Sequence, residues 1–294
     1  SRSRSRSAAE RQASRRQWSA RAVFPDASPM SLSLALLLPA VIVLAGLLER
    51  VWPLRKAPAT WPGRLPSNLA LLLLGVVTDR VLQPAIALLS AWLAAGLGAG
   101  LIGRLALPGP VVVLIGVLAC DLGTYLIHRL MHTPALWRLH ALHHSDRELD
   151  WSTSFRHHPF EKIASSLLFG LWTVLIGIPI DAVLIGLLTI SAWDTLSHSN
   201  WRIPAALERA LARVLVTPQV HALHHSTLSG EADSNYGSIL LIWDRLFGTW
   251  RASDRAPAAF GLSHDIGGLE GRLLPMLRLP FSSELHTGPA STRR

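Results

Sequence analysis

Four long apolar stretches alternate with polar segments along the chain. They cover residues 30–48, 67–103, 105–127 and 163–193. At about 1.5 Å per residue, a helix of about 20 residues spans the roughly 30 Å hydrocarbon core of a bilayer. The second stretch, which contains Asp79 and Arg80, is either one long tilted helix or a helix followed by a partial one. The pattern predicts an all-α fold, a multi-pass transmembrane helical bundle.

The last apolar stretch, residues 163–193, is interrupted near its middle by Gly177 and Pro179. Two helical arms of about 15 residues would each reach only ~22 Å, which is short for a bilayer core. Polar segments that contain histidines flank the stretch on both sides. We therefore expect a helical hairpin that enters the membrane and returns to the same side, beneath a helical cap that faces water.

Composition supports a membrane protein and points to metal chemistry. Half of the 294 residues are hydrophobic and only 16% are charged, against about a quarter in soluble domains. The single cysteine excludes a disulfide scaffold and a thiolate zinc finger. Thirteen histidines accompany that one cysteine, so metal binding through imidazole becomes the first question.

The pattern divides the chain into four parts. We expect a disordered basic leader at 1–29, N-terminal transmembrane helices at 30–107, a histidine-rich domain with the hairpin at 108–250, and C-terminal loops and a tail at 251–294. Seven arginines against Glu10 and Asp26 give the leader +5 of the net charge of +9. Because Met30 directly precedes the first apolar run, we expect the natural protein to start there.

Loop charge predicts the orientation in the membrane. The polar segment 49–66 is basic, and basic loops stay on the cytoplasmic side. This rule places that segment, and everything after Ile127, in the cytoplasm. The argument holds if residues 67–103 cross the membrane once.

The histidines form motifs with helical spacing. Residues three and four apart share one face of a helix, so each motif aims two or three imidazoles at one point. Imidazole suits iron, zinc, copper and nickel, and eight or more such ligands exceed what one tetrahedral ion uses. A site for two metal ions is therefore the economical interpretation. The motifs are H-x3-H at His128 and His132, H-x2-HH at His140, His143 and His144, and a second H-x2-HH at His221, His224 and His225.

Other polar residues leave alternatives open. Asp121 shares a helix face with His128 and His132. One interpretation is that its carboxylate orients a ligating imidazole or an arginine such as Arg129; the alternative is a buried carboxylate without a metal role. Of His157 and His158, one is a candidate ligand and the other a contact for a headgroup or carboxylate. His264 and His286, in the tail, are expected to be ordinary polar residues.

The motifs resemble those of the fatty acid hydroxylase / sterol desaturase superfamily, integral-membrane di-iron enzymes. The resemblance covers roughly residues 108–250 and looks closest to the bacterial sterol-desaturase-like branch. Further matching segments are Arg156-x-His158-Pro159-x-Glu161, His198-Ser-Asn200, Thr217-Pro218, Asn235-Tyr-Gly237 and Trp243 through Thr249.

The resemblance implies the site residues. The catalytic metal ligands of the superfamily fall here on His128, His132, His140, His143, His144, His221, His224 and His225, with His198 as a ninth. Some members carry a further histidine four residues before the ninth ligand, where this chain has Asp194. The tenth ligand is therefore open between Asp194, His158 and a water.

The resemblance also implies the activity. Two iron ions would use O2 to hydroxylate a C–H bond of a sterol, fatty acyl or isoprenoid lipid drawn from the bilayer, and a purified form could contain zinc in their place. The sequence contains neither a dinucleotide-binding fingerprint nor Fe–S cysteines. We therefore expect an external electron donor (a reductase, a ferredoxin or a cytochrome-like protein), no nucleic-acid partner, and a location in the bacterial inner membrane.

Three other functions compete with hydroxylation. A lipid desaturase would use the same site and the same hydrogen abstraction. A membrane metal-binding or transport protein would need ligands along several spans rather than in the cap. A zinc-dependent membrane hydrolase would need a carboxylate base, for which Glu161 is the obvious candidate.

Overall fold

The computed structural model describes residues 29–56, 61–97, 100–102, 107–228, 231–252, 256–262, 269, 271–283 and 285. The chain divides into two units, residues 1–37 and 38–294. The basic leader expected at residues 1–29 lies outside the described residues except for Pro29. The described elements are α2 (Pro29–Val51), α3 (Trp61–Leu97), α4 (Gly109–Met131), α5 (Trp137–His144), η2 (Trp151–Phe155), α6 (Pro159–Ile176), α7 (Ile180–His198), α8 (Ala205–Leu211), α9 (Pro218–His224), α10 (Ile242–Leu246), α11 (Leu273–Arg278) and η3 (Leu279–Phe281).

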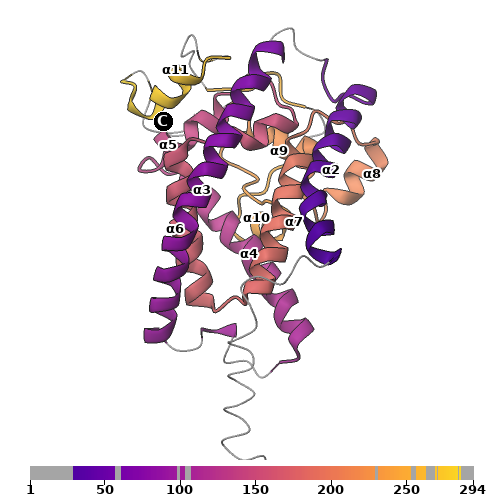
Figure 1. Cartoon of the computed structure of the whole chain (residues 1–294). Helices are drawn as coiled ribbons and strands as arrows, with labels where there is room; N and C mark the ends of the chain where they lie inside the picture. Colours follow the sequence, from indigo (N-terminus) through magenta and orange to yellow (C-terminus); the bar gives the residue numbers. More distant parts are fainter. Residues whose placement is uncertain are drawn as a thin grey trace, which may run out of the picture. The chain divides into compact units, whose positions relative to one another are not determined.

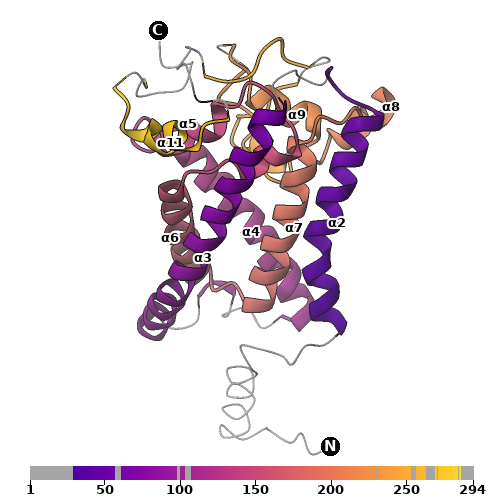
Figure 2. The same ribbon diagram turned by 45° about the horizontal axis from the view of Figure 1, so that its top comes forward.

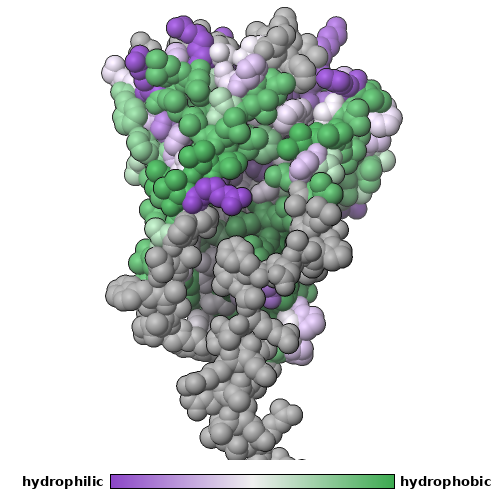
Figure 3. Space-filling model, in the orientation of Figure 1, coloured by the Kyte–Doolittle hydropathy of each residue, from purple (hydrophilic) through white to green (hydrophobic). Residues whose placement is uncertain are grey.

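The long helices α3, α4, α6 and α7 pack side by side as a bundle (Figures 1 and 2). Each contains a segment long and apolar enough to cross a membrane, and hydrophobic residues cover most of the described surface visible in Figure 3. These segments are Gly63–Leu82, Gly109–Met131, Pro159–Ile176 and Ile180–His198. The described residues contain isolated bridges but no strand, so the predicted all-α membrane bundle is confirmed.

Helix α3 settles the alternative left open for the second apolar stretch. It is one continuous helix of 37 residues, about 55 Å long. It also starts earlier than the sequence indicated, because residues 61–66 belong to the helix and not to a polar connection. The reason is Arg64, which is buried in the first turns between the carboxylates of Asp146 (2.7 Å) and Asp150 (2.8 Å).

The expected hairpin is present as α6 and α7. Helix α6 ends at Ile176, and the φ of 72° at the following Gly177 lies in the left-handed region that glycine adopts without strain. Pro179 directly precedes α7. The arms have 18 and 19 residues, about 27–28 Å, and so reach further than the sequence indicated. The start of α6 and the end of α7 both lie close to α5, at the same end of the bundle.

Small residues allow α4 and α7 to approach closely. A Cβ added to Gly116 of α4 would lie 2.5 Å from the Cβ of Ala182 on α7, far inside van der Waals contact. Helices in membranes use such small residues because lipid offers no hydrophobic force to drive them together. This packing matters for the site, because α4 and α7 each carry histidines at their ends.

Two buried arginines tie the cap to the bundle. The guanidinium of Arg156 donates to the carbonyl of Leu142 (3.1 Å) and the hydroxyl of Ser145 (2.9 Å), at the end of α5. Arg64 holds Asp146, which follows the same helix, in a two-pronged contact. Burial raises the pKa of the Asp146 carboxyl, but Arg156 and Arg64 lower it by more. The pKa of Asp146 therefore lies below its usual value. The short helix α5 is thereby fixed at both its end and its following turn.

The close contact between α4 and α7 predicts different effects for the same substitution at two glycines. Gly116→Ala should lower the free energy of unfolding by about 1–3 kcal/mol, because the new methyl group collides with Ala182. Gly75→Ala should be neutral or stabilising, because its nearest neighbour is the flexible end of Lys162 at 3.8 Å. Thermal unfolding of both variants in detergent measures the difference, and equal melting temperatures would contradict the packing.

Candidate metal centre

Nine histidines meet in two buried groups at one end of the bundle. Within each group the ligand nitrogens all lie within 4.8 Å of one another. Group one consists of His128, His132, His140, His144 and His224, and group two consists of His143, His198, His221 and His225. These are the nine residues that the sequence motifs and the resemblance indicated, and neither group includes a carboxylate.

The two H-x2-HH motifs interlock. On α5, His140 and His144 point into group one while His143 points into group two. On α9 the arrangement is reversed, because His221 and its i+4 neighbour join group two and His224 joins group one. Each H-x2-HH motif therefore supplies both groups, and the expectation that all of its rings point at one site is wrong. Because the motifs are shared, the two metal positions cannot be assembled independently of each other.

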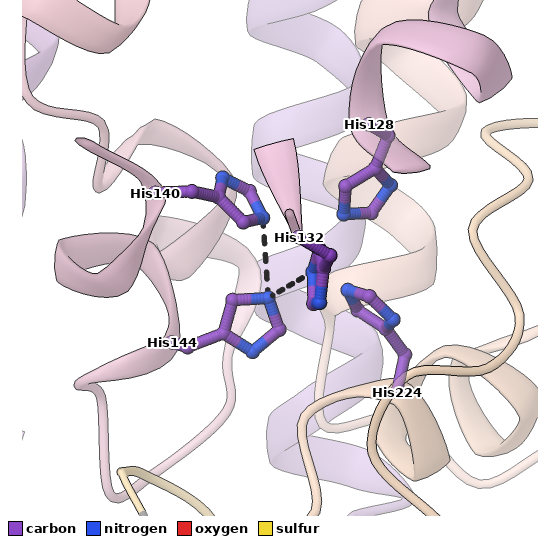
Figure 4. A group of neighbouring side chains, drawn as sticks. All are labelled: His128, His132, His140, His144 and His224. Carbon is purple, nitrogen blue, oxygen red and sulfur yellow. Dashed lines mark hydrogen bonds between the residues drawn. The ribbon is translucent and has the colours of Figure 1, made fainter. Parts of the chain in front are cut away.

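Ring nitrogens within the groups are spaced as ligands of a common ion would be. The Nε2 atoms of His132 and His144 are 3.1 Å apart, and those of His198 and His221 are 2.9 Å apart. Two nitrogens at about 2.1 Å from one ion and at right angles would be about 3.0 Å apart. Figure 4 shows the rings of group one converging from three separate helical segments. The residues therefore fit a metal ion in each group.

Buried lone pairs support the same conclusion. The Nε2 atoms of His128 and His224 have no hydrogen-bond partner among the described residues, although both are buried. Burial, and secondarily the neighbouring imidazoles, hold the pKa values of His132 and His144 well below the usual value. The pKa of His224 falls to about 3, mainly through burial. Such imidazoles are neutral near pH 7, which is the form that binds metals.

In several rings the Nδ1 atom, which faces away from the group, is hydrogen-bonded to a protein oxygen atom. In group one, Nδ1 of His140 bonds to Glu161 (2.7 Å) and Nδ1 of His132 to Asp233 (3.0 Å). The Nδ1 atoms of His128 and His224 donate hydrogen bonds to backbone carbonyl oxygens. Such partners orient a ligating imidazole and fix which nitrogen faces the metal. No pattern in the sequence pointed to Asp233, because an acidic residue in a loop has no distinctive spacing.

Glu161 serves two imidazoles. Its Oε1 also accepts from Nδ1 of His157 at 2.9 Å, and the His157 ring stacks on that of His143 with centroids 4.6 Å apart. Burial lowers the pKa of His157 but the Glu161 carboxylate more than offsets this, so that the pKa is raised. His157 therefore lies beside the centre, and the carboxylate considered above as a hydrolytic base is engaged in positioning rings.

The structure places neither named candidate for the tenth ligand in a group. His158 caps α6: its Nδ1 accepts the amide of Phe160 (3.1 Å) and its Nε2 bonds to the carbonyl of Leu277 (3.1 Å). With both nitrogens engaged, this ring has none free for a metal. The Asp194 carboxylate lies 3.7 Å from Nδ1 of His198, on the side of that ring away from group two. His264 and His286 lie outside the described residues.

Asp121 does not orient an imidazole or an arginine through its carboxylate, contrary to one expectation above. It accepts hydrogen bonds from the amides of Ile239 (3.0 Å) and Leu240 (3.2 Å) and from the indole of Trp243 (2.8 Å). The carboxylate therefore fastens the segment before α10 onto α4. Sequence spacing on one helix face could not reveal these partners, because they lie more than a hundred residues away.

Comparison with known proteins agrees with this geometry. Residues 113–249 match the fatty acid hydroxylase family, and this range contains all nine histidines. No solved structure matches the chain.

Curated relatives share the same region. An ornithine lipid hydroxylase of Rhizobium tropici is 34% identical over 176 residues, covering 58% of this chain and 50% of that protein. Human alkylglycerol monooxygenase is 30% identical over 52% of this chain and 33% of its own length. A Δ7-sterol 5(6)-desaturase of Eremothecium gossypii is 28% identical over 47% and 37%. The chain thus spans half or less of these relatives, and its similarity to the fatty acid hydroxylase family extends over residues 113–249.

Proposed function

We propose that this protein is an integral-membrane di-iron oxidoreductase that uses O2 to hydroxylate a C–H bond of a lipid. The observation that carries the proposal is the pair of buried histidine groups, with five and four converging imidazoles. The relatives are named for ornithine lipid hydroxylation, alkylglycerol monooxygenation and sterol desaturation, and all three reactions oxidise lipids. Sterol, fatty acyl and isoprenoid lipids are the substrate classes that we consider.

Group one would hold one iron ion and group two the other. Bound iron would supply the reduction of O2 and the oxidising power to break an unactivated C–H bond, which no side chain can supply. The imidazoles keep both positions buried and add no negative charge. Glu161 and Asp233 lie behind the rings and hold them in place through their Nδ1 atoms. The tenth ligand position, for which the superfamily offers a histidine, would then fall to a water.

The position of the groups supports a lipid substrate. His128 lies in the last turn of the candidate span Gly109–Met131, and His198 is the last residue of the span Ile180–His198. The centre therefore lies where the apolar segments end, which is the depth at which a bilayer meets water. A lipid chain could reach it without leaving the apolar phase.

Electrons would come from a separate protein, a reductase, a ferredoxin or a cytochrome-like donor. Such a donor would approach from the cap, which we place on the cytoplasmic side of the bacterial inner membrane. The basic connection after α2 supports this orientation, because its chain packs on the cap: the amide of Leu54 donates to Asn200 (3.0 Å) and that of Arg202 to Trp52 (2.8 Å).

A lipid desaturase is the second candidate, because one of the relatives carries that name. Hydrogen abstraction would be common to both reactions, and they diverge only in the fate of the substrate afterwards. A transport role is disfavoured, because the nine histidines gather at one end of the bundle and do not form a path along it.

Replacing one histidine in each group tests the assignment of metal ligands. His224→Ala (group one) and His143→Ala (group two) should each lower bound iron from two ions per chain and abolish turnover, while the protein stays in the membrane. Elemental analysis of the purified protein and a lipid oxidation assay measure both effects. His264→Ala is the control and should be silent. Full iron and activity in either variant would contradict the assignment.

Product mass distinguishes hydroxylation from desaturation. We expect lipids of the producing strain to carry one additional oxygen, derived from labelled O2, that is missing from a deletion strain. A loss of two hydrogens without oxygen gain would instead identify a desaturase. Comparative lipidomics of the two strains makes the measurement, and identical lipid profiles would contradict both.

A further inference from the structure

We propose that the segment Asp233–Tyr236 positions three of the five imidazoles of group one, so that group one holds its metal ion more firmly than group two. The segment contains no histidine and lies outside the three histidine motifs. The inference rests on the proposed occupation of both groups by metal. It adds that the two positions are held with different rigidity, and it names the residues responsible.

Three hydrogen bonds between this segment and the imidazoles of group one support the proposal. The Asp233 carboxylate bonds to Nδ1 of His132 (3.0 Å), the carbonyl of Ser234 to Nδ1 of His224 (2.8 Å), and the carbonyl of Tyr236 to Nδ1 of His128 (3.0 Å). A carbonyl oxygen only accepts hydrogen bonds, so Nδ1 of His128 and His224 must carry the hydrogen. The lone pair of each neutral ring then lies on Nε2, which faces the centre of the group.

The segment is itself held rigidly. Asp233 and Asn235 have φ values of 60° and 54°, in the left-handed region that Asn and Asp tolerate better than other side chains. The Asn235 side chain exchanges hydrogen bonds with the backbone of Arg251 on both its oxygen (2.9 Å) and its nitrogen (3.0 Å). Such conformations persist only where the surroundings determine them.

A second clamp follows immediately along the chain. The Asp244 carboxylate accepts hydrogen bonds from the amides of Tyr236 (2.8 Å) and Gly237 (2.9 Å). The Asp121 carboxylate, on the transmembrane helix α4, accepts hydrogen bonds from the amides of Ile239 and Leu240. The carbonyls that face the imidazoles are therefore fixed from both sides. This accounts for a buried carboxylate on α4 that touches no histidine.

Group two lacks a comparable support. Nδ1 of His198 bonds to the carbonyl of Asp194 (2.7 Å). The Nδ1 atoms of His143, His221 and His225 are buried and have no hydrogen-bond partner among the described residues. Four rings of group one are thus anchored to oxygen, against one ring of group two. A ring without such an anchor can rotate or change tautomer at lower cost, so its metal is released more readily.

Metal release separates the two groups. We would load the purified protein in nanodiscs with Fe(II) without oxygen, add excess bipyridine, and follow the absorbance of its iron complex. Two phases of equal amplitude are expected, the fast one from group two. Asp233→Gly, which removes the carboxylate yet suits the left-handed backbone, should accelerate the slow phase about tenfold or more and leave the fast phase unchanged.

Asp233→Asn is the matched variant. Its amide oxygen can accept the same hydrogen bond from His132 and its backbone tolerates the same φ, so the slow phase should return close to that of the wild type. Equal acceleration of both phases by Asp233→Gly, or a single phase in the wild type, would overturn this inference alone. A wild-type chain that binds no iron would overturn the proposed function as well.

Nitrogen-15 NMR of the metal-free protein, labelled at histidine, provides a measurement that does not depend on loading. The wild type should show Nδ1–H tautomers for the rings that contact the segment. Asp233→Gly should remove one of these signals, that of His132, and spare those of His128 and His224. Unchanged tautomer populations in this variant would overturn the positioning role of Asp233.

Discussion

The structure depends on bringing nine imidazoles together so that their ligand nitrogens are directed at two common points. Burial, and secondarily the neighbouring imidazoles, hold the pKa values of His132 and His144 well below the usual value, because a charged ring would place a cation among close neighbours in a water-poor environment. An uncharged imidazole still has a buried donor and a buried acceptor, and both need partners. Metal ions would satisfy the inward nitrogens, and protein oxygens satisfy several of the outward ones.

This requirement explains why the cap is built from short helices held by many polar contacts. Helices of seven or eight residues such as α5 and α9 are not stable by themselves. The buried guanidinium groups of Arg64 and Arg156 hold α5, and the Thr217 side chain caps α9 through the amide of Val220. Long apolar helices below the cap supply the fixed platform. Stability in the membrane and precision at the metal centre therefore come from different elements that meet at the histidines.

The interlocked motifs link the two metal positions. Each of α5 and α9 contributes rings to both groups, so a displacement of either helix alters both positions together. The segment Asp233–Tyr236 acts on one group only, which gives the chain a way to make the two positions unequal within a nearly repeated arrangement.

Much of this could be predicted from the sequence alone. Apolar runs determined the bundle, the break at Gly177 determined the hairpin, and the four-residue spacing paired His140 with His144 and His221 with His225, because all three depend on local periodicity. The assignment of His143 and His224 to the opposite group was decided by the tertiary structure. Only the tertiary structure decided where α3 starts, which groups Asp121 and Asp233 contact, and that His158 caps the N-terminus of α6. Each of these depends on groups that are distant in sequence and brought together by packing. A hydrogen bond across more than a hundred residues leaves no periodic trace in either segment that makes it.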